Sequence, residues 1–329
     1  PDIKQHGGDV ITFLGITCKR QRSTHTVLLS QYKYIEDLLK RFGMKDCKAQ
    51  PSPYGADFLS DSVPSEPFDT HQYLSLVMSL LYLARITRPD ILFAVTYLAS
   101  KSASPTLGDF NKLKRILRYL VGSLSKAMRM SGISVTLTVF ADASHGLHAD
   151  GKGQSGLVIV MGNSAVYSKS TKQKCVALSS TESEIISQCD AATYVQWLTV
   201  LLQDLHLDQS PPISLCQDNT SAVHMVSNGI TFRKGKHITI KTHFIKTLLE
   251  NGVLKFEYVP SENMIADLHT KPMATPAFVR LAAHFVVNPL DTPKVTLSVY
   301  SDASYSTPST SSYVELYQMD SHKESVLEV

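Results

Sequence analysis

The sequence has little of what marks a secreted, zinc-binding or membrane-spanning protein. Its five cysteines are odd in number and scattered, and no CxxC pair occurs, which argues against a structural zinc site and fits a reducing intracellular compartment. The most apolar stretch, residues 80–99, is interrupted by Arg85, Arg88 and Asp90, so it is a poor membrane span and is predicted to be core. The chain opens at Pro1 without a methionine or a charged-then-apolar leader, so we expect a piece cut from a longer reading frame.

Charge and composition point to no special class of protein. The chain has 329 residues, a formal net charge of +3, 43% hydrophobic residues and 19% charged residues, which are the values of an ordinary globular protein. This length predicts two modest domains plus linkers. Because the chain is only mildly basic, a polyanionic partner would have to be bound by a local basic patch.

The first 130 residues are predicted to be mainly helical after an N-terminal hairpin. The hairpin is predicted from strands over 11–18 and 26–29, and the helical periodicity covers residues 31–42, 72–86, 90–101 and 106–121. The segment 48–72 is predicted to be a linker because it holds four prolines and a glycine. One flank of the last helix is basic, which fits either a solvated face or a polyanion contact.

From about residue 134 the pattern changes to strands alternating with helices. Strands are predicted over 135–142, 156–161, 165–169, 213–216 and 253–259, and helices over 181–205, 220–226, 238–250 and 262–270. This order predicts a mixed five-stranded sheet covered by helices, an α/β fold. Beyond about residue 290 the chain is rich in Ser, Thr and Tyr, and is predicted to be a disordered or loosely attached tail.

Four acidic residues stand where predicted strands end or helices begin: Asp142, Glu184, Asp218 and Asp267. If the strands that end at Asp142 and Asp218 are parallel neighbours, the two carboxylates meet at one sheet edge, where such a cluster could bind Mg²⁺ for phosphodiester hydrolysis. Acids near element ends also occur by chance or as helix caps. Glu182 fits a capping box that starts at Ser179, and a capping role stays open for Glu184 as well.

A series of short motifs runs in order over about residues 10–280 and resembles the Pol polyprotein of copia-type LTR retrotransposons. The motifs are Phe13-Leu-Gly-Ile, Leu29-Ser-Gln-Tyr-Lys-Tyr-Ile, Arg41-Phe-Gly-Met, Leu81-Tyr-Leu-Ala, Thr87-Arg-Pro-Asp-Ile, Lys114-Arg-Ile-Leu-Arg-Tyr-Leu, Ala177-Leu-Ser-Ser-Thr-Glu, Asp218-Asn, Lys236-His-Ile and Ala266-Asp. The resemblance implies that residues 1–50 are the end of the reverse transcriptase palm and the start of the thumb. It further implies thumb and connection over 51–132, an RNase H domain with an RNase H-like sheet covered on both faces over 133–275, and a tail over 276–329.

By the same resemblance, Asp142, Glu184, Asp218 and Asp267 are the catalytic and metal-binding acids of a ribonuclease H. Two Mg²⁺ ions, for which Mn²⁺ can substitute, are then expected in cleavage of the RNA strand of an RNA:DNA hybrid. The family commonly has a second aspartate and a tryptophan where Ser144 and Tyr167 stand here, and neither replacement is an expected ligand. Retroviral enzymes carry a histidine where residues 261–263 stand, so we expect slower product release or assistance from Glu262.

No paired-aspartate polymerase motif precedes Phe13, so this chain alone is not expected to polymerise. The partners implied are the RNA:DNA hybrid and the remainder of the Pol polyprotein, its polymerase palm and fingers, without a membrane. The expected location is intracellular, in a cytoplasmic particle or the nucleus. The residues predicted to contact hybrid phosphates, unless they only solvate a helix face, are Lys234, Lys236, His237, Lys241, Lys169 and Lys172. The alternative function is a catalytically inactive or domesticated hybrid-binding module.

Overall fold

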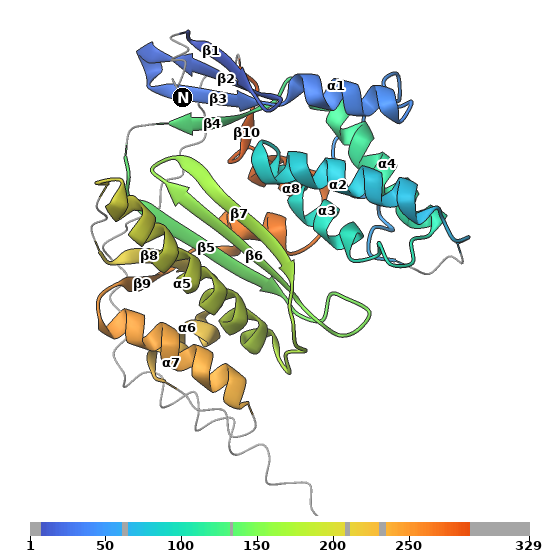
Figure 1. Cartoon of the computed structure of the whole chain (residues 1–329). Coiled ribbons are helices and arrows are strands. Elements are labelled where there is room, and N and C mark those ends of the chain that lie inside the picture. The colour runs from blue at the N-terminus through green and yellow to red at the C-terminus, as the bar shows by residue number, and fades with distance from the viewer. Residues whose placement is uncertain (1–7, 61–64, 132–133, 208–210, 230–234, 290–329) are drawn as a thin grey trace, which may run out of the picture. The chain divides into compact units, whose positions relative to one another are not determined.

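The computed structural model describes residues 8–60, 65–131, 134–207, 211–229 and 235–289 (Figure 1). These residues form two five-stranded sheets with helices packed on them. Among the described helices, none combines the length and apolar character needed to cross a membrane. Most of the predicted tail, residues 290–329, lies outside the described residues.

The first sheet is antiparallel throughout and has the order β1-β2-β3-β4-β10. The prediction of one strand over 11–18 is wrong, because Leu14 and Gly15 have φ angles of 49° and 76° and turn the chain between two strands. Two further strands were not predicted, and they bring distant segments beside the hairpin. The bounds are β1 Val10–Phe13, β2 Ile16–Gln21, β3 Thr26–Ser30, β4 Ala127–Ser131 and β10 Val286–Val287.

The helices of this part of the chain match the four predicted ones and add a fifth. A capping box between Thr106 and Asp109 starts the last of the four. The fifth helix was not predicted, since residues 276–329 were expected to be a tail; residues 276–287 instead fold back onto the first sheet and its helices. The bounds are α1 Tyr32–Arg41, α2 Thr70–Ile86, α3 Leu92–Ala99, α4 Leu107–Gly122 and α8 Thr275–Ala282.

The segment 48–72 does not behave as a linker, because two of its aromatic side chains enter the helical core. Tyr54 is 6% exposed and Phe58 1% exposed, and the Tyr54 ring centroid lies 5.1 Å from that of Phe58 and 5.6 Å from that of Phe278 on α8. The part of this segment that carries Tyr54 and Phe58 is thus held by packing. This corrects the prediction, which rested on composition alone.

The motif that begins at Thr87 forms a buried ion pair rather than a surface site. Arg88 and Asp90 are 1% and 0% exposed, and the Arg88 guanidinium donates to both Asp90 oxygens at 2.8 to 3.3 Å. The Tyr119 hydroxyl donates to Asp90 at 2.6 Å, and Ser123 accepts from Arg88 at 2.7 Å. Each buried charge therefore has partners, as burial requires. The pair fixes the short turn η2 (Pro89–Ile91) between α2 and α3.

The second sheet confirms the predicted mixed, RNase H-like arrangement. Its order is β7-β6-β5-β8-β9, with antiparallel pairing from β7 through β5 and parallel pairing from β5 through β9. All five strands were predicted from the sequence, with small shifts at their ends. The bounds are β5 Leu137–Ser144, β6 Gln154–Met161, β7 Ser164–Lys172, β8 Ile213–Gln217 and β9 Leu254–Tyr258.

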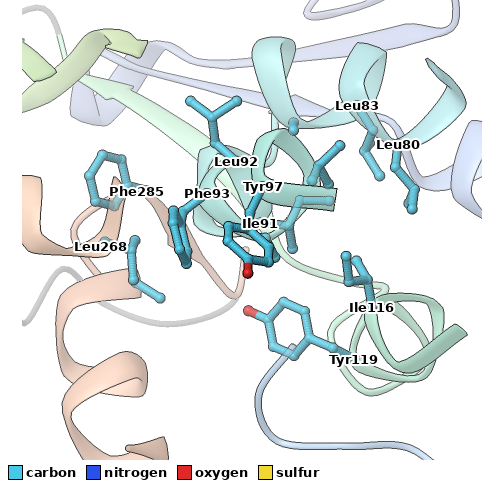
Figure 2. Close-up of a cluster of buried hydrophobic side chains, with 14 of the residues drawn as sticks. Leu80, Leu83, Ile91, Leu92, Phe93, Tyr97, Ile116, Tyr119, Leu268 and Phe285 are labelled. Atoms are coloured by element: carbon cyan, nitrogen blue, oxygen red, sulfur yellow. The ribbon is translucent and has the colours of Figure 1, made fainter. Parts of the chain in front are cut away.

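Helices and turns cover both faces of this sheet. On one face, α5 (Ser180–Asp204), α6 (Thr220–Ser227) and α7 (Lys236–Glu250) share a core with side chains of β5, β6 and β8. On the other face, Phe140 and Cys216 belong to the core that also contains α2, α3, α4 and α8. Figure 2 shows Leu268 and Phe285 beside Phe93 in this core.

Candidate active site

Three of the four predicted acids lie together at one edge of the second sheet. β5 and β8 are parallel neighbours with Phe140 opposite Cys216, so Asp142 and Asp218 leave the sheet side by side. Glu184 comes to the same place from the start of α5. One carboxylate oxygen from each of the three lies within 4.8 Å of the others. The expected convergence of distant acids is therefore present.

Asp142 is fixed by contacts on both its backbone and its side chain. It lies inside β5, opposite Gly156 of β6. The strand was predicted to end at Asp142, but it continues for two more residues, to Ser144. The side chain belongs to a residue only 4% exposed, and its Oδ2 accepts a hydrogen bond from the Thr270 hydroxyl. The Ser187 hydroxyl donates to the Asp142 carbonyl oxygen at 2.8 Å. The carboxylate is therefore oriented before any ion binds.

Glu184 is a buried acid without a capping role. The N-cap of α5 is Ser179, whose side chain accepts from the Glu182 N–H at 3.2 Å, so the predicted cap is confirmed and accounts for Glu182. Glu184 is 5% exposed, and its Oε2 has no hydrogen-bond partner among the described residues. Burial, followed by the charges of Asp142 and Asp218, raises the pKa of Glu184 well above its usual value. A buried carboxylate oxygen without a hydrogen-bond partner fits the role of a cation ligand.

Asp218 follows the last residue of β8 and is half-buried. The Ser261 hydroxyl donates to its Oδ2 at 2.7 Å, from the short turn η3 (Ser261–Asn263) after β9. This turn stands where a histidine was expected in retroviral enzymes. Its Glu262 side chain is exposed, while the Glu262 carbonyl accepts from Arg280 at 3.0 Å. Ser261 is thus the residue of this turn that contacts the acids, and sequence reasoning did not find it.

Asp267 lies beside Asp142, outside the group of three. The predicted helix over 262–270 is wrong: Asp267 sits in a 3-10 turn, η4 (Ile265–His269), and its Oδ1 lies 2.7 Å from the Lys271 Nζ. Burial raises the pKa of Asp267 to about 8, the Asp142 charge adds to this, and Lys271 opposes it. The turn can approach β6 closely because Gly156 has no side chain; a Cβ there would lie 2.7 Å from the Ala266 carbonyl oxygen.

The arrangement suits a hard divalent cation. Within the described parts of the chain, Asp142, Glu184 and Asp218 are the group found with the spacing to hold a metal ion. Carboxylate oxygens are the ligands Mg²⁺ prefers, and the buried, unpartnered Oε2 of Glu184 gives such an ion a protein ligand that has no other role. The residues present therefore fit a magnesium-type site.

The residues predicted to contact phosphates differ in their exposure and in the partners they already have. Lys234 lies outside the described residues. Lys236 and His237 are exposed in the first turn of α7, and Lys241, in its second turn, is half-buried beside Cys189. Lys169 lies 3.6 Å from Asp190 and 4.7 Å from the Tyr194 ring centroid, while Lys172 lies 2.9 Å from Asp150. Of the predicted cluster, Lys236 and His237 are the most available to a ligand.

The two positions where the family differs from this chain have no ligand role in the structure. Tyr167 stacks on Tyr194, with ring centroids 4.8 Å apart. Ser144 ends β5 and pairs with Gln154 of β6. Neither belongs to the group of acids that could hold a metal ion.

Comparisons with known proteins agree with the motifs. No family model matches the chain. It is 35% identical over 282 residues to the retrovirus-related Pol polyprotein from transposon RE2 of Arabidopsis thaliana, covering 84% of this chain and 19% of that polyprotein. It is 32% identical over 273 residues to the corresponding polyprotein from transposon TNT 1-94 of Nicotiana tabacum, covering 80% and 20%. The chain thus spans about a fifth of the length of these relatives.

Among solved structures, the N-terminal RNase H domain of rv2228c from Mycobacterium tuberculosis matches at 13% identity and a TM-score of 0.32, over 45% of this chain and 97% of that one.

Proposed function

Because the chain belongs to the family of copia-type, retrovirus-related Pol polyproteins, we propose that it supplies the ribonuclease H activity of such a polyprotein. The substrate is the RNA strand of an RNA:DNA hybrid, and the products carry 5′-phosphate and 3′-hydroxyl ends. The observation that carries the proposal is the convergence of Asp142, Glu184 and Asp218 to within 4.8 Å, with Asp267 beside Asp142.

The protein's own part in this reaction is to hold and orient charge. Asp142, Glu184 and Asp218 would hold Mg²⁺ through carboxylate oxygens, and Asp267 would complete a second position with Asp142. When bound, Mg²⁺ activates water for attack on the phosphodiester and stabilises the leaving oxygen. The hydroxyls of Thr270 and Ser261 keep the carboxylates of Asp142 and Asp218 in place.

Hybrid binding is assigned to the basic residues near α7 and β7. Lys236 and His237 are exposed at the helix start and are available to phosphates; Lys234, Lys241, Lys169 and Lys172 remain in the proposal as weaker contributors. Phosphate contacts of this kind give affinity without sequence preference. We further propose that residues 1–132 are the end of the palm, the thumb and the connection, which work with polymerase segments outside this chain.

A cleavage assay on a labelled RNA:DNA hybrid tests the function. The purified chain should cut the RNA strand with Mg²⁺ and stop when EDTA is added. Asp218→Asn should lower the cleavage rate at least about a hundredfold, because a ligand charge is lost at the reacting phosphate. Asp204→Asn, an exposed acid at the far end of α5, is the matched control and should leave the rate unchanged.

The same assay addresses the alternative function. Hybrid binding is measured in parallel by fluorescence anisotropy, with EDTA present so that no strand is cut. If the wild-type chain and Asp218→Asn both bind the hybrid and neither cuts it with Mg²⁺, the nuclease proposal is wrong and a hybrid-binding module remains.

A further inference from the structure

We propose that Lys271 is an internal cation which fills the place of one divalent ion in the metal-free site, and which that ion must displace in order to bind. This inference rests on the proposed function, because it concerns the same carboxylates. The Lys271 Nζ lies 2.7 Å from the Asp267 Oδ1. The Asp267 side chain is 9% exposed and that of Lys271 42% exposed, so the ammonium reaches the buried acid from the solvent side.

Two consecutive residues, Thr270 and Lys271, contact two of the four acids, Asp142 and Asp267. Thr270 is fully buried and donates its hydroxyl to Asp142, while Lys271 pairs with Asp267. The chain that leaves η4 therefore places a neutral donor on one carboxylate and a positive charge on the next. Both residues follow directly from the turn that carries Asp267, so their positions are coupled to it.

The acids consequently form two unequal subsets that share Asp142. In the first, Asp142, Glu184 and Asp218 lie within 4.8 Å of one another, and Glu184 Oε2 has no partner among the described residues. In the second, the ammonium of Lys271 is already paired with Asp267. The first subset is open to a cation, whereas the second already holds one positive charge.

The chemistry of lysine suits a charge that has to leave. Its ammonium is a strongly hydrated point charge on a flexible four-carbon stem, and here it can move into water without disturbing the backbone. A divalent ion carries twice the charge and can coordinate carboxylates that an ammonium only pairs with. Binding at the second subset nevertheless has to break the ion pair, so the second ion should bind more weakly than the first.

Manganese binding to the hybrid-free protein tests this inference without using activity. Free Mn²⁺ is counted by electron paramagnetic resonance during titration of wild type, Lys271→Met and Lys246→Met. Lys246 is the matched control, because it forms an i,i+4 ion pair with Glu250 at 3.6 Å on α7, away from the acids. Wild type and Lys246→Met should both bind one tighter and one weaker ion. In Lys271→Met the weaker affinity should rise about fivefold, the scale of losing one partly exposed ion pair, while the tighter one stays.

An unchanged or weaker second affinity in Lys271→Met would overturn the inference, as would the absence of Mn²⁺ binding in wild type. Lys271→Gln is the second variant and should behave in the same way if Lys271→Met does not fold. The two proposals fail in different ways. If the weaker Mn²⁺ affinity rises in Lys271→Met but wild type does not cut hybrid, the internal-cation proposal is supported and the nuclease proposal is wrong. If wild type cuts hybrid but Lys271→Met and wild type have the same Mn²⁺ affinities, only the internal-cation proposal is wrong.

Discussion

Replacing Asp267 by asparagine should make the metal-free protein more stable at neutral pH. It should also remove the part of the pH dependence of the unfolding free energy that comes from this carboxyl group. Burial, and then the neighbouring Asp142, raise the pKa of Asp267 to about 8. The Asp142–Asp267 pair therefore keeps one proton in the folded state, which leaves one negative charge beside Lys271. The stability that comes from this proton is fully present below the unfolded pKa of about 4. That stability is lost as the pH rises toward 8. An asparagine imitates the protonated acid at every pH, so the variant lacks this loss.

The size of the effect follows from the number of protons involved. Between pH 5 and pH 7 the folded state keeps one proton that the unfolded state has released, which costs about 1.4 kcal/mol per pH unit. Wild type should therefore lose roughly 2.7 kcal/mol relative to Asp267→Asn over this interval. For a chain of this size that corresponds to a difference of roughly 4 °C in melting temperature. Lys271 lies 2.7 Å away and opposes the shift, and the pKa of about 8 already includes its effect.

The assay is urea unfolding of both proteins in EDTA at pH 5, 6, 7 and 8. Comparing the two proteins at each pH cancels the contributions of all other titrating groups, among them the buried histidines. The reasoning is refuted if the two stability curves stay parallel, or if wild type gains on the variant as the pH rises. Added Mg²⁺ should then stabilise wild type more than Asp267→Asn, because the variant has lost a ligand charge.

Three further predictions concern the packing around the site. Arg88→Met should lower the free energy of unfolding by about 3–5 kcal/mol in urea titrations, because Asp90 is then buried without its partner; adding Asp90→Asn should recover part of the loss. Gly156→Ala should reduce hybrid cleavage about a hundredfold while the circular dichroism spectrum is retained, because its Cβ would lie 2.6 Å from the Thr270 methyl carbon and push η4 from the sheet. Burial lowers the pKa of His269 to about 3, so its neutral form contributes stability above pH 6.5 that is lost as the pH falls; His269→Leu should remove about 1.4 kcal/mol per pH unit from the acid-induced loss measured between pH 6 and pH 4.

The parts of the fold that the sequence predicts well are those with local signals. The five strands of the second sheet alternate apolar and polar residues or end at clear turns, and α5 has an N-cap at Ser179. The placement of Asp142 beside Asp218 also follows from sequence, because two parallel neighbouring strands end at the same sheet edge. Glu184 joins them because α5 packs against β5 and carries Glu184 near its start.

The parts that the sequence did not predict depend on contacts between distant segments. The strand β10 has only two residues and exists because it pairs with β4, more than 150 positions earlier. The hydroxyls of Ser261 and Thr270 belong to turns with no periodic pattern, yet they reach Asp218 and Asp142. Lys271 carries one weak local signal, its i,i+4 spacing from Asp267, which is the spacing of ion pairs on a helix.

The second sheet does not have a core of its own on both faces. This decides which fragment of the chain could fold as an active nuclease. Its α5 face packs within residues 137–254, but its other face shares one core with α2, α3, α4 and α8. The turn η4 lies in that shared core: Leu268 is fully buried, and the His269 carbonyl accepts from Ser170 at 2.7 Å. Ser170 is in turn bonded to Thr96 of α3 at 3.1 Å. A piece limited to 133–275 would expose this apolar face to water and loosen the turn that positions Asp267. The acid cluster therefore depends on helices that the sequence alone assigns to a different domain.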